Sequence, residues 1–317
     1  LMNIALVTPA RPVAHSGNRN TAMRWAKLLR ALGHRVKVEM QWGGTPADVM
    51  IALHALRSHD SIARFAQAYP ERPLIVMLTG TDLYGDIHCD RLAQRSLDLA
   101  DGLVVLQTEG LRELAAKHRR KARVIHQSTR PIKAARPLKS CFEVCVSGHL
   151  REVKDPFRLA AALAHLPAES RIRALQLGGA MSGSVDRQAR AWMRREPRYR
   201  WTGEVTHGRA LGLLARSRLM VISSRTEGGA NVVTEALAAG VPVLASRVSG
   251  NIGMLGRDYA GYFPFGNERA LARLLWRAES EPAFYRRLKQ QCGARRDITK
   301  PAREKEAIRK LLHEIAA

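Results

Sequence analysis

The chain has 317 residues, and its 52 lysines and arginines against 28 aspartates and glutamates give a formal net charge of +24. Hydrophobic residues make up 46% of the chain, which is enough for full-sized cores. This composition excludes a disordered basic tail, a collagen-like fibre and a coiled coil, and the length favours two domains.

The positive charge favours an anionic partner, whether nucleic acid, a membrane surface or a small phosphorylated substrate. However, the 41 arginines and 11 lysines are scattered through every predicted helix instead of forming one run. A compositional bias toward arginine explains such a spread equally well. We therefore predict no nucleic-acid partner and expect much of the charge to lie on the solvated surface.

The N-terminal residues lack the charged start and long apolar core of a signal peptide, and no run of about 18 apolar residues could span a bilayer. The four cysteines form no C-x-x-C pair, and no His or Cys cluster has the spacing of metal ligands. We therefore expect a cytoplasmic protein with no membrane partner, no metal site and no tightly bound cofactor.

In the first part of the chain, short apolar runs alternate with amphipathic helical stretches. The first run, 4–7, is followed by a loop and then by a helix predicted over 19–32. Further strands are predicted at 35–39, 49–53, 74–78 and 103–106. Strands that alternate with helices in this way form a parallel sheet covered on both faces.

A Pro- and Lys/Arg-rich stretch over 129–140 interrupts the alternation and is interpreted as a linker. A second alternating series follows, with strands predicted at 142–146, 172–177, 219–222 and 241–244, and helices at 231–239 and 301–315. The pattern predicts two Rossmann-like, doubly wound domains, 1–138 and 139–300, facing a central cleft at the carboxyl ends of their strands. By analogy with such folds, residues 301–317 are expected to cross back to the first domain.

The stretch 223–243 carries the most specific signal. Two glycines follow a predicted strand and precede a helix, so backbone N–H groups can approach a phosphate closely there. Glu227 and Glu235 bracket this turn with seven residues between them, one at the strand exit and the other two turns into the helix. Carboxylates so placed could bind sugar hydroxyls while the helix start holds phosphate, as a nucleotide sugar requires. The turn residues expected to contact this ligand are Gly228, Gly229, Ala230 and Asn231.

This stretch resembles the E-x7-E signature of retaining, GT-B-fold glycosyltransferases of family four. Three further pieces match that family in order along the chain: Gly-His-Leu-Arg-Glu-Val-Lys-Asp-Pro at 148–156, the turn Gly178-Gly179, and Trp-Thr-Gly-Glu-Val at 201–205. The resemblance covers about 144–277. It implies that Lys154 holds the donor diphosphate, that the two glycines line the donor and that Trp201 lies in the nucleobase loop.

One position departs from the family pattern. The family usually has Arg directly after the first Gly, where this chain has His149, and Arg151 is our candidate for the missing guanidinium. Alternatives stay open for the other residues. Lys154 and Glu235 could be solvated helix charges, and Trp201 could be a packing residue.

Three loops of the first domain, 16–25, 53–58 and 78–84, follow strand ends and should converge on the cleft. They offer cations and hydroxyls rather than aromatic platforms, which suits a small anionic acceptor. His54 and Asp82 are the candidates to orient the acceptor or assist its chemistry, with a core histidine and a turn or cap residue as their alternatives. The candidate acceptor-binding residues are Gly17, Asn18, Arg19, Arg57, Ser58 and Thr81.

Three motifs together resemble the selenosugar synthases of selenoneine biosynthesis: Ser-Gly-Asn-Arg at 16–19, Arg-Trp-Ala-x-Leu-Leu-Arg-x-Leu-Gly-His-Arg-Val at 24–36, and Leu-Thr-Gly-Thr-Asp-Leu-Tyr at 78–84. This resemblance extends over nearly the whole chain. It implies transfer of a sugar from UDP-N-acetylglucosamine or UDP-glucose onto selenophosphate, and functional coupling to other enzymes of that pathway. An anionic selenium nucleophile needs no strong general base.

Two other functions stay open at this point. One is a family-four enzyme that acts on a polysaccharide, lipid or small-molecule hydroxyl. The other is a non-catalytic protein that binds nucleotides or nucleic acid through its charge. No Asp-x-Asp motif occurs, which disfavours the metal-dependent donor site of the other common glycosyltransferase fold.

Overall fold

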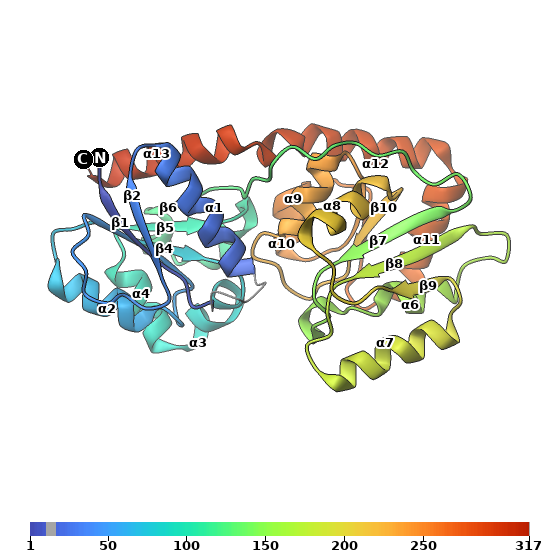
Figure 1. The fold of residues 1–317 in the computed structure, drawn as a ribbon, viewed down its shortest axis with the longest axis horizontal. Helices are drawn as coiled ribbons and strands as arrows, with labels where there is room; N and C mark the ends of the chain where they lie inside the picture. The colour runs from blue at the N-terminus through green and yellow to red at the C-terminus, as the bar shows by residue number, and fades with distance from the viewer. Residues whose placement is uncertain (11–16, 317) are drawn as a thin grey trace. The chain divides into compact units, whose positions relative to one another are not determined.

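The computed structural model describes residues 1–10 and 17–316, which form two compact units (Figure 1). Unit 1 comprises Leu1–Ser128 and the C-terminal helix, and unit 2 comprises Thr129–Lys300. Each unit contains one six-stranded sheet whose strands pair in parallel. The predicted α/β class with two parallel, helix-covered sheets is confirmed.

The sheet of unit 1 has the strand order β2-β1-β3-β4-β5-β6. The central strands are buried on both faces, which explains why they read as unbroken apolar runs. The strands are β1 (Asn3–Val7), β2 (Arg35–Glu39), β3 (Val49–Leu53), β4 (Leu74–Leu78), β5 (Gly102–Val105) and β6 (Ala122–Val124).

Helices pack on both faces of this sheet because successive strand side chains point to opposite sides. Trp25 of α1 (Gly17–Ala31) and Ile308 of α13 (Pro301–Ala316) belong to one apolar cluster. Phe65 of α2 belongs to the other. The remaining helical segments are α2 (His59–Ala68), a π-helical turn (Asp82–Asp86), α3 (Ile87–Cys89), α4 (Arg91–Leu99), a 3-10 turn (Thr108–Glu113) and α5 (Ala116–Arg119).

The sheet of unit 2 has the order β12-β11-β10-β7-β8-β9 and is built around one large apolar cluster. Its strands are β7 (Phe142–Ser147), β8 (Ile172–Leu177), β9 (Tyr199–Trp201), β10 (Leu219–Ile222), β11 (Val243–Ser246) and β12 (Tyr262–Phe263). Its helical segments are a 3-10 turn (Glu152–Lys154), α6 (Arg158–Leu163), α7 (Gly183–Arg195), α8 (His207–Arg216), α9 (Asn231–Ala239), α10 (Ser249–Leu255), α11 (Glu268–Ser280), α12 (Pro282–Arg295) and a second 3-10 turn (Arg296–Thr299).

One predicted strand begins in the wrong place. The run 241–244 was expected to be a strand, but β11 begins at Val243. Gly240 ends α9 in a left-handed conformation, with φ of 72°, and Val241 N–H donates to the carbonyl of Ala236. The first residues of the predicted run therefore complete the hydrogen bonds at the end of α9, and the strand begins two residues later than predicted.

Candidate functional site

The carboxyl edge of the unit 2 sheet brings together the first carboxylate of the E-x7-E stretch and the predicted diphosphate lysine. Glu227 follows β10 and is buried, with 7% of its surface exposed. Its Oε1 contacts Lys154 Nζ and accepts a hydrogen bond of 2.5 Å from Ser224 Oγ. The ammonium group of Lys154 therefore pairs with a buried carboxylate, which argues against the alternative that Lys154 is a solvated helix charge.

The segment that carries Lys154 is fastened to the end of β10. Ser223 Oγ donates to the carbonyls of Lys154 and Asp155, at 3.1 and 2.9 Å, and Arg225 N–H donates to that of Val153 at 2.8 Å. Asp155 has a φ of 46°, in the left-handed region, where the 3-10 turn ends. Backbone bonds thus determine where the lysine lies. Arg151, just before the turn, is exposed.

A glycine outside the predicted site shapes the same turn. A Cβ atom on Gly250, in α10, would lie 1.8 Å from the carbonyl oxygen of Glu227. Real side chains never approach so closely, so only glycine fits against this backbone. The sequence contained one signal for this role. Gly250 lies shortly after β11, in the triplet Ser249-Gly250-Asn251, and a glycine after a strand often marks a close backbone approach.

The second carboxylate, Glu235, is the fifth residue of α9 and so lies about one turn into the helix, not two as expected. Ala230 occupies the N-cap position and provides no side-chain cap for the amides of the first turn. Glu235 Oε1 lies 2.8 Å from His207 Nε2, at the start of α8. This hydrogen bond raises the pKa of His207 above its usual 6.5.

The glycine turn after β8 packs against the turn after β7. A Cβ on Gly178, whose φ is 125°, would lie 2.1 Å from the carbonyl oxygen of Gly148. Trp201 donates its indole N–H to the carbonyl of Gly178 at 2.8 Å, and its ring is half-buried. This geometry favours the packing interpretation of Trp201. Gly179 lies beside His149, the residue that departs from the family pattern.

In unit 1, the loops after β3 and β4 meet at His54. Its ring is 2% exposed, and its backbone has a φ of 74°, a left-handed conformation that is uncommon outside glycine. Its Nε2 lies 3.0 Å from Thr81 Oγ1 and 3.8 Å from Asp86 Oδ2, while Nδ1 accepts from Arg57 N–H at 3.3 Å. Burial lowers the pKa of His54.

The carboxylate of Asp82 holds these two loops together. Its carboxylate is completely buried and accepts backbone N–H groups from Thr79, Gly80 and Ala55, at 3.0, 2.9 and 3.0 Å. These bonds tie the β4 loop to the β3 loop, which supports the turn interpretation. A π-helical turn begins at Asp82, and such turns are frequent at functional sites.

The other predicted acceptor residues differ in exposure. Arg57 and Thr81 are exposed, whereas Ser58 is buried and donates to the carbonyl of Leu53 at 2.6 Å. Gly17 is exposed at the start of α1, where Asn18 and Arg19 are half-buried. Ser16, the first residue of that motif, lies outside the described residues.

Comparisons with known proteins agree with the geometry of unit 2. The family model of glycosyl transferases group 1 matches residues 132–295, more than half of the chain and nearly all of unit 2. The chain belongs to this family. The coarser part of the sequence interpretation, a glycosyltransferase, is thereby confirmed.

Solved structures of similar fold align with almost the entire glycosyltransferase. Sucrose-phosphate synthase from Thermosynechococcus elongatus is 18% identical, with 99% of each chain covered and a TM-score of 0.80. Anabaena HepE in complex with UDP and glucose is 16% identical, covering 99% of this chain and 100% of its own, with a TM-score of 0.78. A glycosyltransferase from Rickettsia africae is 13% identical, at 99% and 98% coverage, with a TM-score of 0.75. Such likenesses show the fold, and the GT-B expectation is confirmed.

The structure describes residues 1–10 and 17–316 of this glycosyltransferase. Among these residues, no group of His, Cys, Asp and Glu side chains is arranged to hold a metal ion. Within the same part of the chain, no helix is long and apolar enough to cross a membrane.

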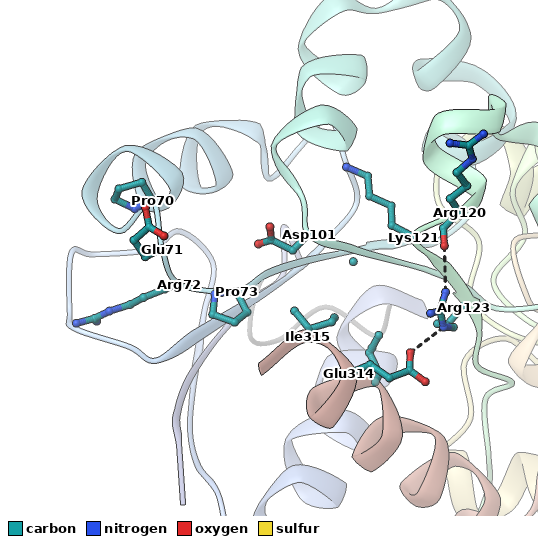
Figure 2. Close-up of a pocket in the computed structure, with 12 residues that line it drawn as sticks. Pro70, Glu71, Arg72, Pro73, Asp101, Arg120, Lys121, Arg123, Glu314 and Ile315 are labelled. Carbon is teal, nitrogen blue, oxygen red and sulfur yellow. Dashed lines mark hydrogen bonds and ion pairs between the residues drawn. The ribbon is translucent and has the colours of Figure 1, made fainter. Parts of the chain in front are cut away.

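A cavity of about 480 Å³ lies at the opposite, amino-terminal edge of the unit 1 sheet (Figure 2). Loops that lead into β4, β5 and β6 line it together with the last turns of α13, and Arg123 Nε pairs there with Glu314 at 2.9 Å. Ligands of parallel α/β sheets bind at the carboxyl ends of the strands. Within unit 1, the candidate acceptor site is therefore the carboxyl edge of the sheet near His54, not this cavity.

Proposed function

We propose that this glycosyltransferase moves a sugar from a UDP-sugar to selenophosphate and releases UDP and a selenosugar. The observation that carries the donor assignment is the contact between Lys154 and Glu227 beside the start of α9. An ammonium and a carboxylate side by side suit a ligand with a diphosphate next to sugar hydroxyls. The bound UDP and glucose in the structurally similar HepE support a UDP-sugar as the donor class.

Different residues of unit 2 bind the diphosphate and the sugar hydroxyls of the donor. Lys154, Arg151 and the amides at the start of α9 stabilise the charge that grows on the diphosphate as UDP leaves. Glu227 and Glu235 accept hydrogen bonds from donor hydroxyls. The turn Gly178-Gly179 lets the backbone approach the donor, and Trp201 holds that turn through its bond to Gly178.

The reaction exchanges one bond at the anomeric carbon. The bond from this carbon to the diphosphate oxygen breaks, and UDP departs with the electron pair. A lone pair of the selenium forms the new carbon–selenium bond. Because selenophosphate is already an anion, no side chain needs to remove a proton from it.

The acceptor side rests on the loops of unit 1. Two exposed residues, Arg57 and Thr81, contact the buried His54 ring through the Arg57 backbone N–H and the Thr81 hydroxyl. Arg19 lies at the start of α1. Cations and hydroxyls of this kind bind a phosphate-like group. We assign Asp82 to holding the loops, because all its described hydrogen bonds go to backbone amides.

The test measures UDP release from UDP-N-acetylglucosamine and from UDP-glucose, each with selenophosphate, thiophosphate or glycerol, together with mass analysis of the products. We expect release that depends on selenophosphate and a product containing selenium. Lys154→Ala should lower the rate by roughly a hundredfold or more. Lys289→Ala, an exposed lysine of α12, serves as the matched control and should leave it unchanged.

Two results would contradict this proposal. Equal UDP release with glycerol would assign the enzyme to hydroxyl acceptors. Salt-sensitive RNA binding with no affinity for UDP would instead indicate a nucleic-acid binder that uses the +24 charge.

A further inference from the structure

The two carboxylates of the E-x7-E stretch are held by partners of different chemistry. Glu227 is held by the primary ammonium group of Lys154. Glu235 is held by His207, with 2.8 Å between Oε1 and Nε2. The Glu235 side chain is 13% exposed and that of His207 is 61% exposed. One carboxylate of the site therefore depends on a group that titrates near neutral pH and is open to solvent.

The backbone places His207 where it can reach α9. His207 is the first residue of α8, and Thr206 caps that helix by accepting a hydrogen bond from Arg209 N–H at 3.4 Å. The helix dipole disfavours a cation at this end of α8. The carboxylate of Glu235 opposes that effect, so the pair stabilises the protonated imidazole.

Two charged groups and partial burial act on the imidazole. Glu235 on α9 raises the pKa of His207, burial lowers it, and the exposed Arg130 in the segment before β7 also lowers it. On α8 itself, Arg216 is engaged by Glu143. The net shift is upward from 6.5, so the charge of His207 is lost as the pH rises through a value above 6.5.

We propose that His207 is a positioning residue of the donor site: it holds Oε1 of Glu235, leaves Oε2 to the donor hydroxyls and makes donor affinity dependent on pH. This inference rests on the proposed UDP-sugar donor but not on the acceptor. A neutral imidazole still carries one N–H, so loss of the charge weakens the hold on Glu235 without removing it. Donor affinity should therefore decrease gradually, not abruptly, above neutral pH.

Two substitutions separate the hydrogen bond from the charge. His207→Ala removes both, and His207→Gln keeps a donor without a titratable charge. His165→Ala, at the end of α6, removes another exposed histidine of unit 2 and is the matched control. The dissociation constant of UDP is measured by calorimetry from pH 6 to 8.5, and KM and kcat for the UDP-sugar are measured over the same range.

We expect His207→Ala to raise the UDP dissociation constant and the donor KM roughly five- to tenfold at pH 6.5, with kcat changed less than about twofold. The wild-type constant should rise as the pH increases through the raised pKa of His207. The UDP dissociation constant of His207→Gln at pH 6.5 should lie between those of the wild type and His207→Ala. This variant should lose the pH dependence caused by His207 and retain only that of the UDP phosphates. In the Glu235→Ala background, which removes the acceptor, His207→Ala should add nothing.

The outcomes distinguish this inference from the proposed function. If wild-type protein binds UDP and His207→Ala binds it equally well, His207 has no positioning role and the donor assignment stands. If the UDP dissociation constant of His207→Gln still rises above neutral pH as that of the wild type does, the pH dependence belongs to another group and the inference is overturned as well. Absence of UDP binding by the wild type at every pH would overturn the donor assignment and this inference together.

Discussion

Trp25 and Glu304, 279 positions apart in the chain, are joined by a hydrogen bond of 2.9 Å from the indole Nε1 to a carboxylate oxygen. The same buried carboxylate accepts from Arg24 Nε at 2.9 Å and from both the N–H and the hydroxyl of Ser128, at 2.8 and 2.5 Å. It thus connects α13 to α1 and to the segment after β6. The C-terminal helix is held in unit 1 by a charge-assisted network as well as by apolar contacts.

Glu304→Ala should therefore destabilise unit 1 by about 3–5 kcal/mol, because it leaves a guanidinium and buried donors without their acceptor. Glu304→Gln keeps one acceptor oxygen and should cost roughly half as much. Urea unfolding followed by circular dichroism measures both. Glu306→Ala, on the same helix but partly exposed, is the control and should change little. Equal midpoints for all three variants would show that the network does not stabilise the unit.

Gly250→Ala should disrupt the turn that presents Glu227. Its Cβ would lie 1.8 Å from a backbone oxygen that no side-chain rotation can move. We expect a loss of about 1–3 kcal/mol in stability and a large fall in kcat/KM for the UDP-sugar. The control is Gly212→Ala in α8, where nothing lies within 4 Å and alanine favours the helix. Similar activities of the two variants would contradict the role of Gly250.

The stability of unit 1 should depend on pH through His54. Because burial lowers its pKa, the folded protein binds this proton less readily than the unfolded chain does. The stabilising contribution of neutral His54 is complete above about pH 6.5 and decreases as the pH falls below that value. His54→Asn tolerates the left-handed backbone and removes the titration. Thermal melting between pH 5 and 7.5 should show a smaller pH dependence for this variant than for the wild type, and an unchanged dependence would exclude His54 as the source.

Asp82→Ala should destabilise unit 1 by more than about 3 kcal/mol, since three backbone amides lose their acceptor in a buried place. Asp82→Asn retains one carbonyl oxygen and should show a smaller loss. Asp60→Ala, an exposed position in α2, is the control. Denaturant unfolding gives the stability, and acceptor-dependent UDP release gives the activity. If Asp82→Asn is fully stable but inactive, the carboxylate acts on substrate and the turn assignment is wrong.

The alternation of apolar runs and helices was sufficient to predict the parallel sheets. A central strand that is buried on both faces needs apolar residues at successive positions, so it appears in the sequence as a continuous apolar run. It missed β6, β9 and β12, which have three, three and two residues and lie at the edges of their sheets. Strands this short bury too little surface to leave a pattern. The E-x7-E spacing predicted Glu227 and Glu235 as donor residues, and the match at 148–156 predicted Lys154. Together these motifs pointed to the family that the comparison shows.

The sequence by itself determined the fold class, the glycine turns and the residue types of the candidate donor site, because these depend on periodicity and on spacing along the chain. Only the tertiary structure decided which partner each group has: Lys154 for Glu227, His207 for Glu235, backbone amides for Asp82 and Trp25 for Glu304. Such pairs join segments far apart in the chain, and their energies come from burial and distance. The spacing of residues along one segment predicts neither the burial of such a pair nor the distance between its members.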